Sequence, residues 1–575
     1  MDTTSDKLFC CRWLRNKLPL VHRDELYHIV RMTGPLLLSR ILMYLLPFVV
    51  TMFCGRLGNS VMAGYGLASA AINVSTAATG CGLGLACDTL ISQTFGGKNL
   101  LRVGGILQRG IIILLLFCLP CWALLINAQA ILLCMGQDPE VARIAQLYIM
   151  AFLPAVPVSF IYKFTHGVLL FVYSLVVCCC LCFQGIILPQ FYTAVLANIA
   201  NVLTNYVFLH WLNLGVSGSA AANTLSQIYI CIFLFAYIRW KKLHEATWGG
   251  WSADSLQEWG SYMRLAIPSA LMKCFEWWIY EFGGFFAGML GEDELAAQHA
   301  VLMIAFITYM FPNGIQAAVC ARVGNALGAG DTARAILTSK LSLGLAVVQG
   351  IVLGTSKTVL GFLFTSDEKI IELVSNLMNA YCFLQFFDGL CVCTGIFLGT
   401  GKQKIPAVAN FIGYYCIGLT LSVVFMFVVK LKVLGFWLGL LVCVVLQSIF
   451  YIVVVFKLNW KQMTEEVLPI TKFSLLDTEN LSENSWVDDH RLHERSTGTN
   501  GGPADQHHRG GRLTTTQLIV RRGILIFAAV CLLAVGVGVR LLVPLPVTSS
   551  KHNSTLDLFN TTQTPVLLTP TVLAQ

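Results

Sequence analysis

Apolar runs of about 20 residues recur along this chain, and no other feature of the sequence restricts its fold as strongly. A helix needs about 20 apolar residues to cross the hydrocarbon core of a bilayer. Of the 575 residues, 56% are hydrophobic and 12% are charged, whereas about 25% are charged in an average soluble protein. Helices satisfy all their own backbone hydrogen bonds inside lipid. The sequence therefore predicts an all-α polytopic membrane protein.

The runs form two sets of six, followed by one additional C-terminal run. In chain order, the predicted spans are Pro35–Phe53, Ala63–Leu85, Ile106–Ile126, Ile144–Ile161, Phe191–Leu209, Val216–Tyr237, Leu265–Leu290, Ala296–Ala318, Leu341–Phe364, Leu373–Leu398, Ala407–Val429, Val433–Phe456 and Gly523–Leu545. The predicted regions are an N-terminus (1–30), an N-lobe (31–240), an inter-lobe loop (241–262), a C-lobe (263–458), a polar linker (459–520), the last span (523–545) and a tail (546–575).

Lysine and arginine residues gather in alternate connections between the spans, at Arg12, Arg15, Lys17, Arg23, Lys98, Arg102, Arg109, Arg239, Lys241, Lys242, Arg322, Arg334, Lys340, Lys402 and Lys404. Such residues mark cytoplasmic loops, so we expect a cytoplasmic N-terminus and linker. The expected location is the plasma membrane. Thirteen spans then place the C-terminus outside the cell. The tail carries glycosylation sequons at Asn553 and Asn560, which only the outer side could use. The sequon at Asn480, in the linker, is expected to carry no glycan.

Several short sequences recur between the two halves of the chain. The matches are FCGRLG (Phe53–Gly58) with FAGMLG (Phe286–Gly291), ISQTFGGKN (Ile91–Asn99) with VGNALGAGD (Val323–Asp331), and Leu214-Gly215 with Leu434-Gly435. Because an even number of spans separates the copies, both lobes have the same orientation and a pseudo-twofold axis along the membrane normal. Two six-helix lobes around such an axis create a central cleft, and rocking of one lobe against the other gives alternating access.

Charged side chains inside predicted spans point to function, because burying them in lipid is costly. The first span of the C-lobe contains Lys273, Glu276 and Glu281, its fourth contains Asp388, and the first span of the N-lobe contains Arg40. Burial disfavours the charged form of a carboxyl group and so favours uptake of a proton. Competition between a proton and a cation for one carboxylate is a minimal antiport mechanism.

Aromatic side chains accompany the acids of the seventh span. On a helix, Tyr280 lies on the face of Lys273 and Glu276, and Trp277 lies on the face of Glu281. Aromatic rings attract organic ammonium ions, so this helix is expected to form a cation-binding wall. Two alternatives stay open: Glu276 only pairs with Lys273 to hold the helix, and the aromatic residues only pack.

The source of energy follows from a missing motif. No G-x-x-x-x-G-K-[ST] phosphate loop occurs, so we expect neither direct use of ATP nor an enzyme. Protons are the expected coupling ion, with no metal and no other cofactor.

Small organic cations and the lipid bilayer are the expected partners, with no nucleic acid, and a monomer is expected. One proton exchanged for one monovalent cation moves no net charge, so each unit of pH difference drives about a tenfold gradient.

The sequence resembles the multidrug and toxin extrusion (MATE) family, in particular its vertebrate organic cation/proton antiporters. The resembling stretches are ACDTLISQTFGGKNL, LQRG, HEATWGGW, EWW, RVGNALGAGD and IGYY, and the resemblance covers roughly Leu26–Trp460 and the last span. It implies export of organic cations and xenobiotics in exchange for protons. It also implies proton and cation binding by Glu276, Glu281 and Asp388, and a cleft lined by Trp277, Tyr280, Tyr309 and Asn73.

The chain departs from the family pattern at several charged positions. Leu302 and Met303 stand where vertebrate members have Tyr-Glu, so one carboxylate is missing. Asp388 replaces a glutamate, Lys273 replaces an apolar residue, and Arg40 replaces an amide. Because two added cations and one lost acid weaken the attraction for organic cations, a family member with impaired transport is one alternative. A lipid or lipid-linked flippase of the same two-lobe architecture is another, since such a protein is expected to have a basic cavity.

Residues 163–184 form a further departure, because this segment is about a dozen residues longer than in relatives. Val168–Cys182 is apolar but short for a span. If it crossed the membrane, every later span would invert and the sequons of the tail would be cytoplasmic. We therefore interpret it as a re-entrant segment or as an error in the inferred protein sequence.

Overall fold

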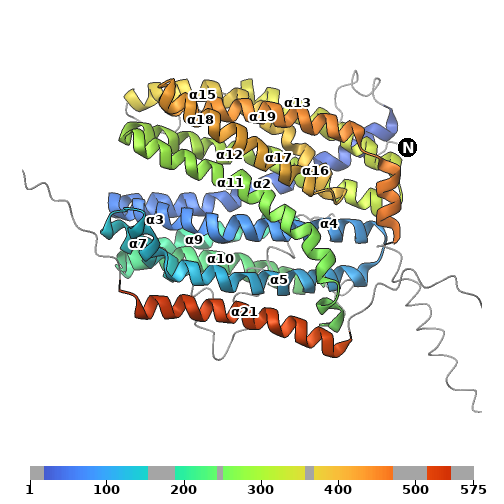
Figure 1. Cartoon of the computed structure of the whole chain (residues 1–575), viewed down its shortest axis with the longest axis horizontal. Helices are drawn as coiled ribbons and strands as arrows, with labels where there is room; N and C mark the ends of the chain where they lie inside the picture. The colour runs from blue at the N-terminus through green and yellow to red at the C-terminus, as the bar shows by residue number, and fades with distance from the viewer. Residues whose placement is uncertain (1–18, 153–187, 243–249, 356–367, 470–513, 545–575) are drawn as a thin grey trace, which may run out of the picture.

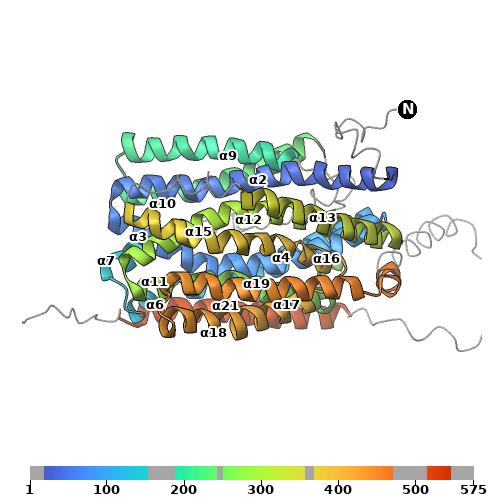
Figure 2. The same cartoon turned by 90° about the horizontal axis from the view of Figure 1, so that it is seen from above.

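The computed structural model describes residues 19–152, 188–242, 250–355, 368–469 and 514–544. Within these ranges the regular secondary structure is helical and contains no strand. The long helices run side by side along one direction (Figures 1 and 2). Ten helical segments in the described ranges are long and apolar enough to cross a membrane. The predicted all-α polytopic fold is confirmed.

Two groups of helices lie against each other, and α2, α11 and α12 lie in the middle, where the groups meet (Figure 1). The helix α21 is the outermost helix on the side of the N-lobe. The N-lobe consists of α2 (Leu20–Leu57), α3 (Asn59–Ile72), η2 (Asn73–Ala77), α4 (Ala78–Gly96), α5 (Leu100–Ile126), α6 (Ala128–Cys134), α7 (Pro139–Phe152), α9 (Leu188–Tyr206), η4 (Val207–Trp211) and α10 (Gly215–Trp240). After η5 (Ala253–Leu256), the C-lobe consists of α11 (Trp259–Leu290), α12 (Glu292–Gly328), α13 (Thr332–Thr355), α15 (Glu368–Gly389), η7 (Leu390–Val392), α16 (Cys393–Gly399), α17 (Lys404–Asn410), η8 (Phe411–Leu419), α18 (Thr420–Val423), η9 (Val424–Val428) and α19 (Lys432–Lys457). The last described helix is α21 (Thr515–Leu542).

The helices extend beyond the predicted apolar spans. The first and seventh spans are predicted to begin at Pro35 and Leu265, whereas α2 begins at Leu20 and α11 at Trp259. Hydropathy detects the part of a helix that lies in lipid, whereas helical turns continue into the polar region. Although α11 has 32 residues, it is not among the ten apolar segments, since its three buried or half-buried charged side chains make it less apolar.

Some predictions concern residues outside the described ranges. The fourth span is described only as far as Phe152. The segment 163–184 and the sequons at Asn480, Asn553 and Asn560 lie outside the described residues, as do most of the polar linker and the tail.

The internal repeat predicted from FCGRLG and FAGMLG appears in the backbone. Gly58 ends α2 with a φ of 139°, and Gly291 ends α11 with a φ of 141°. Both values fall where a residue with a Cβ is strained, so each copy of the motif requires glycine at its last position. In the loops after α4 and α12, Lys98 and Gly330 also share a positive φ, 62° and 80°. The two lobes therefore repeat one backbone path.

The last helices of the two lobes, α10 and α19, align in a different register from the predicted one. Matching Leu214-Gly215 with Leu434-Gly435 is wrong by three residues. The structurally equivalent pairs are Asn213 with Lys430 and Gly215 with Lys432, which share positive φ, and Gly218 with Gly435, which pack closely on Phe208 and Phe425. A shift of three residues is nearly one helical turn, so both registers present similar faces and the sequence pattern did not separate them.

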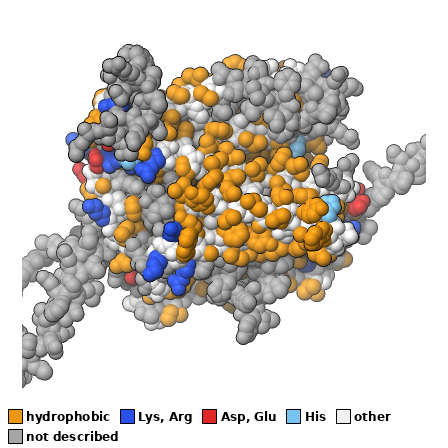
Figure 3. All heavy atoms as spheres, turned by 180° about the vertical axis from the view of Figure 1, so that it is seen from behind, with side chains coloured by type: hydrophobic (Ala, Val, Ile, Leu, Met, Phe, Trp, Pro, Cys, Tyr) orange, Lys and Arg blue, Asp and Glu red, His pale blue; other side chains and the backbone are white. Residues whose placement is uncertain are grey.

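The molecular surface has a broad hydrophobic area over the helices, with lysine and arginine side chains gathered toward one end (Figure 3). This end holds the α4–α5, α12–α13 and α16–α17 connections, and we call it the basic end. The other end, where α2 meets α3 and α11 meets α12, is the opposite end. A hydrophobic flank between two polar ends fits a protein embedded in a bilayer.

The additional helix α21 packs on α5 of the N-lobe. A Cβ at Gly536 would come within 2.6 Å of the Ala123 side chain, so glycine permits this close approach. The Asn127 side chain donates a hydrogen bond to the Gly536 carbonyl over 2.8 Å. At the basic end, the guanidinium of Arg522 lies 4.1 Å from the centre of the Trp259 ring. These contacts dock the last helix on the outer face of the bundle.

Candidate functional site

Three side chains from α11 and α12 form a hydrogen-bonded group in the interior. The Lys273 ammonium donates to both carboxylate oxygens of Glu276, over 3.1 and 2.9 Å. The Tyr309 hydroxyl also donates to Glu276, and it accepts from Lys273 over 3.3 Å. The side chains of Lys273 and Glu276 are only 6% and 13% exposed. The structure therefore adds Tyr309 of α12 to the Lys273–Glu276 pair of α11.

Tyr309 lies next to a break in the hydrogen-bond pattern of α12. Pro312 has no backbone N–H, so the carbonyl of Thr308, four residues earlier, loses its usual helical partner. The Gln385 side chain of α15 donates to this carbonyl over 3.3 Å, and Tyr381 donates to Gln385 over 2.6 Å. These bonds tie α12 to α15 beside the site.

The other predicted site residues of the C-lobe differ from one another in burial and in contacts. Asp388 is 5% exposed and lies on α15, one turn beyond Gln385. Glu281 is half-buried on α11, and within the described ranges no hydrogen bond or ion pair reaches its carboxylate. Tyr280 packs toward the C-lobe core, with its ring centre 6.4 Å from that of Trp437. Tyr280 is partly buried against the hydrophobic cluster of the C-lobe.

The N-lobe presents a widened helical turn to α11. Asn73 begins the π-helix η2, which interrupts the helix formed by α3 and α4. Such turns leave backbone groups out of the regular ladder and are frequent at functional sites. Here the Val74 carbonyl accepts a hydrogen bond from the Trp278 indole over 3.1 Å, and the Ser75 carbonyl accepts one from Cys121 over 3.2 Å. The sequence analysis missed Trp278, although the EWW motif contains it.

Arg40 lies on the N-lobe side of the same region. It is half-buried on α2, whereas Lys273 is buried on α11. The two cations that distinguish this chain from the family pattern thus lie in different lobes. Their charges offset part of the negative charge of the acids.

Between this region and the basic end, the backbones of the two lobes touch. A Cβ at Gly96 would overlap the backbone of Asn325, and a Cβ at Gly328 would overlap the backbone of Gln93. Gly96 corresponds to Gly328 and Gln93 corresponds to Asn325 in the repeated motifs, so the two contacts are pseudo-twofold copies. The glycines of ISQTFGGKN and VGNALGAGD are therefore required where the two motifs pack against each other.

Side-chain hydrogen bonds reinforce the same contact. Thr89 of α4 donates to the Leu398 carbonyl over 2.9 Å, and Gln93 donates to the Gly399 carbonyl over 3.0 Å. Gln403 donates to the Thr89 hydroxyl over 2.7 Å. All three bonds join the N-lobe to the C-lobe, so the interface is closed at the basic end.

Two equivalent glutamates connect the lobes at the basic end. Glu25 and Glu258 each lie ten residues before the proline of the first helix of their lobe. Glu25 is 3% exposed and accepts from Arg322 (2.9 Å), Arg334 (3.0 Å) and Thr338 (2.8 Å) of the C-lobe. Glu258, whose side chain is 54% exposed, lies 3.5 Å from Arg102 and 3.3 Å from Arg109 of the N-lobe. Arg102 and Arg334 each follow the end of the repeated motif by three residues, so these ion pairs are copies too.

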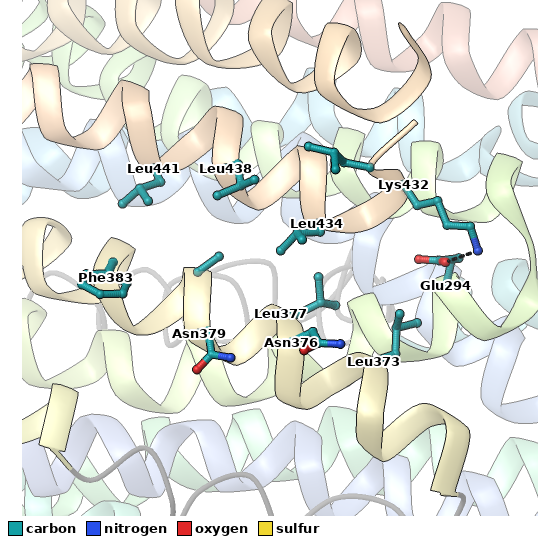
Figure 4. A pocket seen from close by; sticks show the side chains of 12 residues that line it. Glu294, Leu373, Asn376, Leu377, Asn379, Phe383, Lys432, Leu434, Leu438 and Leu441 are labelled. Carbon is teal, nitrogen blue, oxygen red and sulfur yellow. Dashed lines mark ion pairs between the residues drawn. The ribbon is translucent and has the colours of Figure 1, made fainter. Parts of the chain in front are cut away.

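A cavity of about 520 Å³ lies elsewhere, between α15 and α19 at the opposite end (Figure 4). Leu377, Phe383 and Leu438 line its apolar part, and the ion pair between Glu294 and Lys432, 2.9 Å long, lies at one end. None of the predicted proton- or cation-binding residues lines this cavity.

Comparisons with known proteins agree with the two-lobe architecture. A family model described as MatE matches residues 35–207 and 268–424. The chain is 45% identical to multidrug and toxin extrusion protein 1 of Danio rerio over 567 residues, which cover 93% of this chain and 94% of that protein. It is 42% identical to the Homo sapiens protein of the same name, over 90% of this chain and 94% of that protein.

Solved structures resemble the same bundle. The eukaryotic MATE transporter AtDTX14 is 25% identical, with a TM-score of 0.72, and the match covers 78% of this chain and 100% of that chain. A MOP superfamily transporter from Pyrococcus furiosus, at 17% identity and a TM-score of 0.66 over 76% of this chain and 96% of that chain, shares the fold. These relatives are transporters rather than enzymes, and the chain belongs to the multidrug and toxin extrusion family of membrane transporters.

Proposed function

We propose that this transporter exports small organic cations in exchange for protons, and that Glu276, Glu281 and Asp388 form the acidic group at which the exchange takes place. The observation that carries this proposal is the position of the α11 acids. Glu276 and Glu281 lie on the helix that contacts the π-helix of the N-lobe through Trp278 and Val74. A carboxylate at the lobe interface can meet a proton or a cation from one side and release it to the other when the lobes rock.

The proposed orientation places the basic end in the cytoplasm of a cell with the transporter in its plasma membrane. The surface distribution of lysine and arginine supports it. In this orientation the structure is closed toward the cytoplasm, because the Gly96 and Gly328 contacts and the Glu25 ion pairs lie at the basic end. Export would then require these contacts to break, so that the site is loaded from the cytoplasm. We propose a monomer as the transporting unit, with protons as the coupling ion.

The test is uptake of a radiolabelled monovalent quaternary amine into acid-loaded proteoliposomes. We expect accumulation to rise about tenfold for each unit of pH difference and to vanish without one. Glu276→Gln should abolish exchange, because it removes one negative charge and leaves the Lys273 ammonium buried without its carboxylate. Glu140→Gln, at an exposed position of α7, is the control. Downhill flux that is indifferent to pH would contradict the proposal and favour a channel.

The flippase alternative is not favoured, since the relatives that cover nearly the whole chain are multidrug and toxin extrusion proteins. The missing acid at Leu302-Met303 and the added cations leave substrate range as the property in which this chain is expected to differ from those relatives.

A further inference from the structure

The Glu276 carboxylate already holds a cation that belongs to the protein. Its oxygens accept two hydrogen bonds from Lys273 and one from Tyr309. The ammonium lies 2.9 Å from Oε2 and is itself 5.9 Å from the centre of the Tyr309 ring. A carboxylate and an aromatic ring around an ammonium are also the groups that would recognise an organic cation. Lys273 therefore occupies the place that such a cation would take at Glu276.

A tethered ammonium is a strong competitor for this place. Groups joined by a short link meet at an effective concentration of about millimolar or more, so an external cation at micromolar concentration would rarely displace Lys273 from Glu276. The side chains of both residues are also largely buried, at 6% and 13% exposure. The pair is electrically neutral, and it offers little net attraction to a second cation.

Glu281 differs from Glu276 on each of these points. It is half-buried, and no ion pair or hydrogen bond to it occurs in the described part of the chain. It lies one helical turn beyond Trp277, whose ring shares its face. The buried and half-buried charged residues of α11 are Lys273, Glu276 and Glu281. Together they offer the substrate one net negative charge rather than two, and that charge is at Glu281.

We propose that Lys273 is a specificity-determining residue that neutralises Glu276, assigns cation binding to Glu281 and Trp277, and restricts the substrates to organic cations with a single positive charge. A dication would need both acids of α11, and Glu276 is already paired with Lys273. This inference rests on the proposed exchange of cations for protons, and it names the charge class of the substrate.

The experiment compares a labelled tetraalkylammonium with a labelled bis-quaternary alkane diammonium in acid-loaded proteoliposomes. In the unmodified protein, we expect exchange of the monocation and little of the dication. Lys273→Met keeps a similar side-chain length without the charge, and it should raise the ratio of dication to monocation transport at least about tenfold, the size expected for one added unit charge at close range. Arg264→Met removes an exposed cation of the same helix and should leave the ratio unchanged.

A double variant separates the two acids. Glu276→Gln alone should stop exchange by leaving an unpaired ammonium, whereas Glu276→Gln combined with Lys273→Met should recover monocation exchange, because Glu281 remains. Glu281→Gln should not be rescued by Lys273→Met. If Lys273→Met does not reach the membrane, Lys273→Gln serves in the same assay.

Three outcomes are decisive. An unchanged ratio in Lys273→Met with intact monocation exchange would overturn the proposal, and so would a double variant that stays inactive although it is folded. Absence of any pH-driven exchange in the unmodified protein would instead reject the proposed function itself, so the two failures are distinguishable.

Discussion

The two halves of the lobe interface are built from different kinds of contact. At the basic end, glycines bring backbone against backbone, and Glu25 and Glu258 add ion pairs that repeat with the pseudo-twofold symmetry. Near Lys273 and Glu276, Gly82 also packs against the backbone of Ala270, and the Trp278 indole donates a hydrogen bond to a π-helical carbonyl. Close packing at glycines therefore occurs in both halves, whereas the repeated ion pairs lie at the basic end.

This difference indicates how the transporter can rock without losing its site. The ion pairs between the lobes are gathered at the basic end, where they repeat in both lobes and do not involve the acids of α11. The site residues are held mainly within the C-lobe, by Tyr309 and by the bonds of Gln385. The lobes can therefore separate at the basic end while the charged group stays assembled.

The largest effect is expected from the two equivalent glutamates. Glu25→Gln should lower the free energy of unfolding by about 3 kcal/mol, because it leaves two arginines beside a buried position without their carboxylate. Glu258→Gln should lower it by at most about 1 kcal/mol, since its side chain is 54% exposed and solvent screens the pair. Thermal unfolding of the purified variants measures both. Equal effects would show that the burial of Glu25 does not matter.

A smaller effect is expected from a single methyl group at the glycine contact. In Gly96→Ala the new Cβ overlaps the backbone of Asn325, so the lobes must shift apart at the basic end, at a cost of about 1–3 kcal/mol. Thermal unfolding and the exchange assay both report it. Gly84→Ala is the matched control, because it lies on the same helix and its Cβ would meet no atom within 4 Å. Equal unfolding temperatures and exchange rates in the two variants would show that Gly96 does not pack against the Asn325 backbone.

The smallest effect is expected near the site. Trp278→Phe keeps an aromatic ring but removes the indole N–H that donates to the Val74 carbonyl, and it should lower stability by about 1 kcal/mol. Trp211→Phe, at a residue that is 74% exposed, should change the unfolding midpoint less. A loss as large as that of Glu25→Gln would remove the contrast between the two halves of the interface.

Much of the fold could be read from hydropathy and repeated motifs, and part of the site from helical spacing. Lys273 and Glu276 lie three residues apart, so their pairing on one face follows from the geometry of any helix. The contact of Trp278 with Val74 could not be predicted, because it depends on a π-helical turn that has no recognisable sequence pattern. The role of Pro312 in freeing the Thr308 carbonyl for Gln385 also required knowledge of which helix lies beside α12.

By itself, the sequence determined that the chain forms apolar helices in two repeated sets, and that Lys273, Glu276 and Glu281 lie inside the seventh span. These properties depend on composition and on spacing along one helix, which are local. Only the tertiary structure decided that the glycines of the repeated motifs face each other, that Tyr280 packs into the C-lobe core, and that Glu281 rather than Glu276 lacks an ionic partner within the described ranges. Those outcomes depend on the approach of helices far apart in the chain, and helix packing sets distances that no local pattern contains.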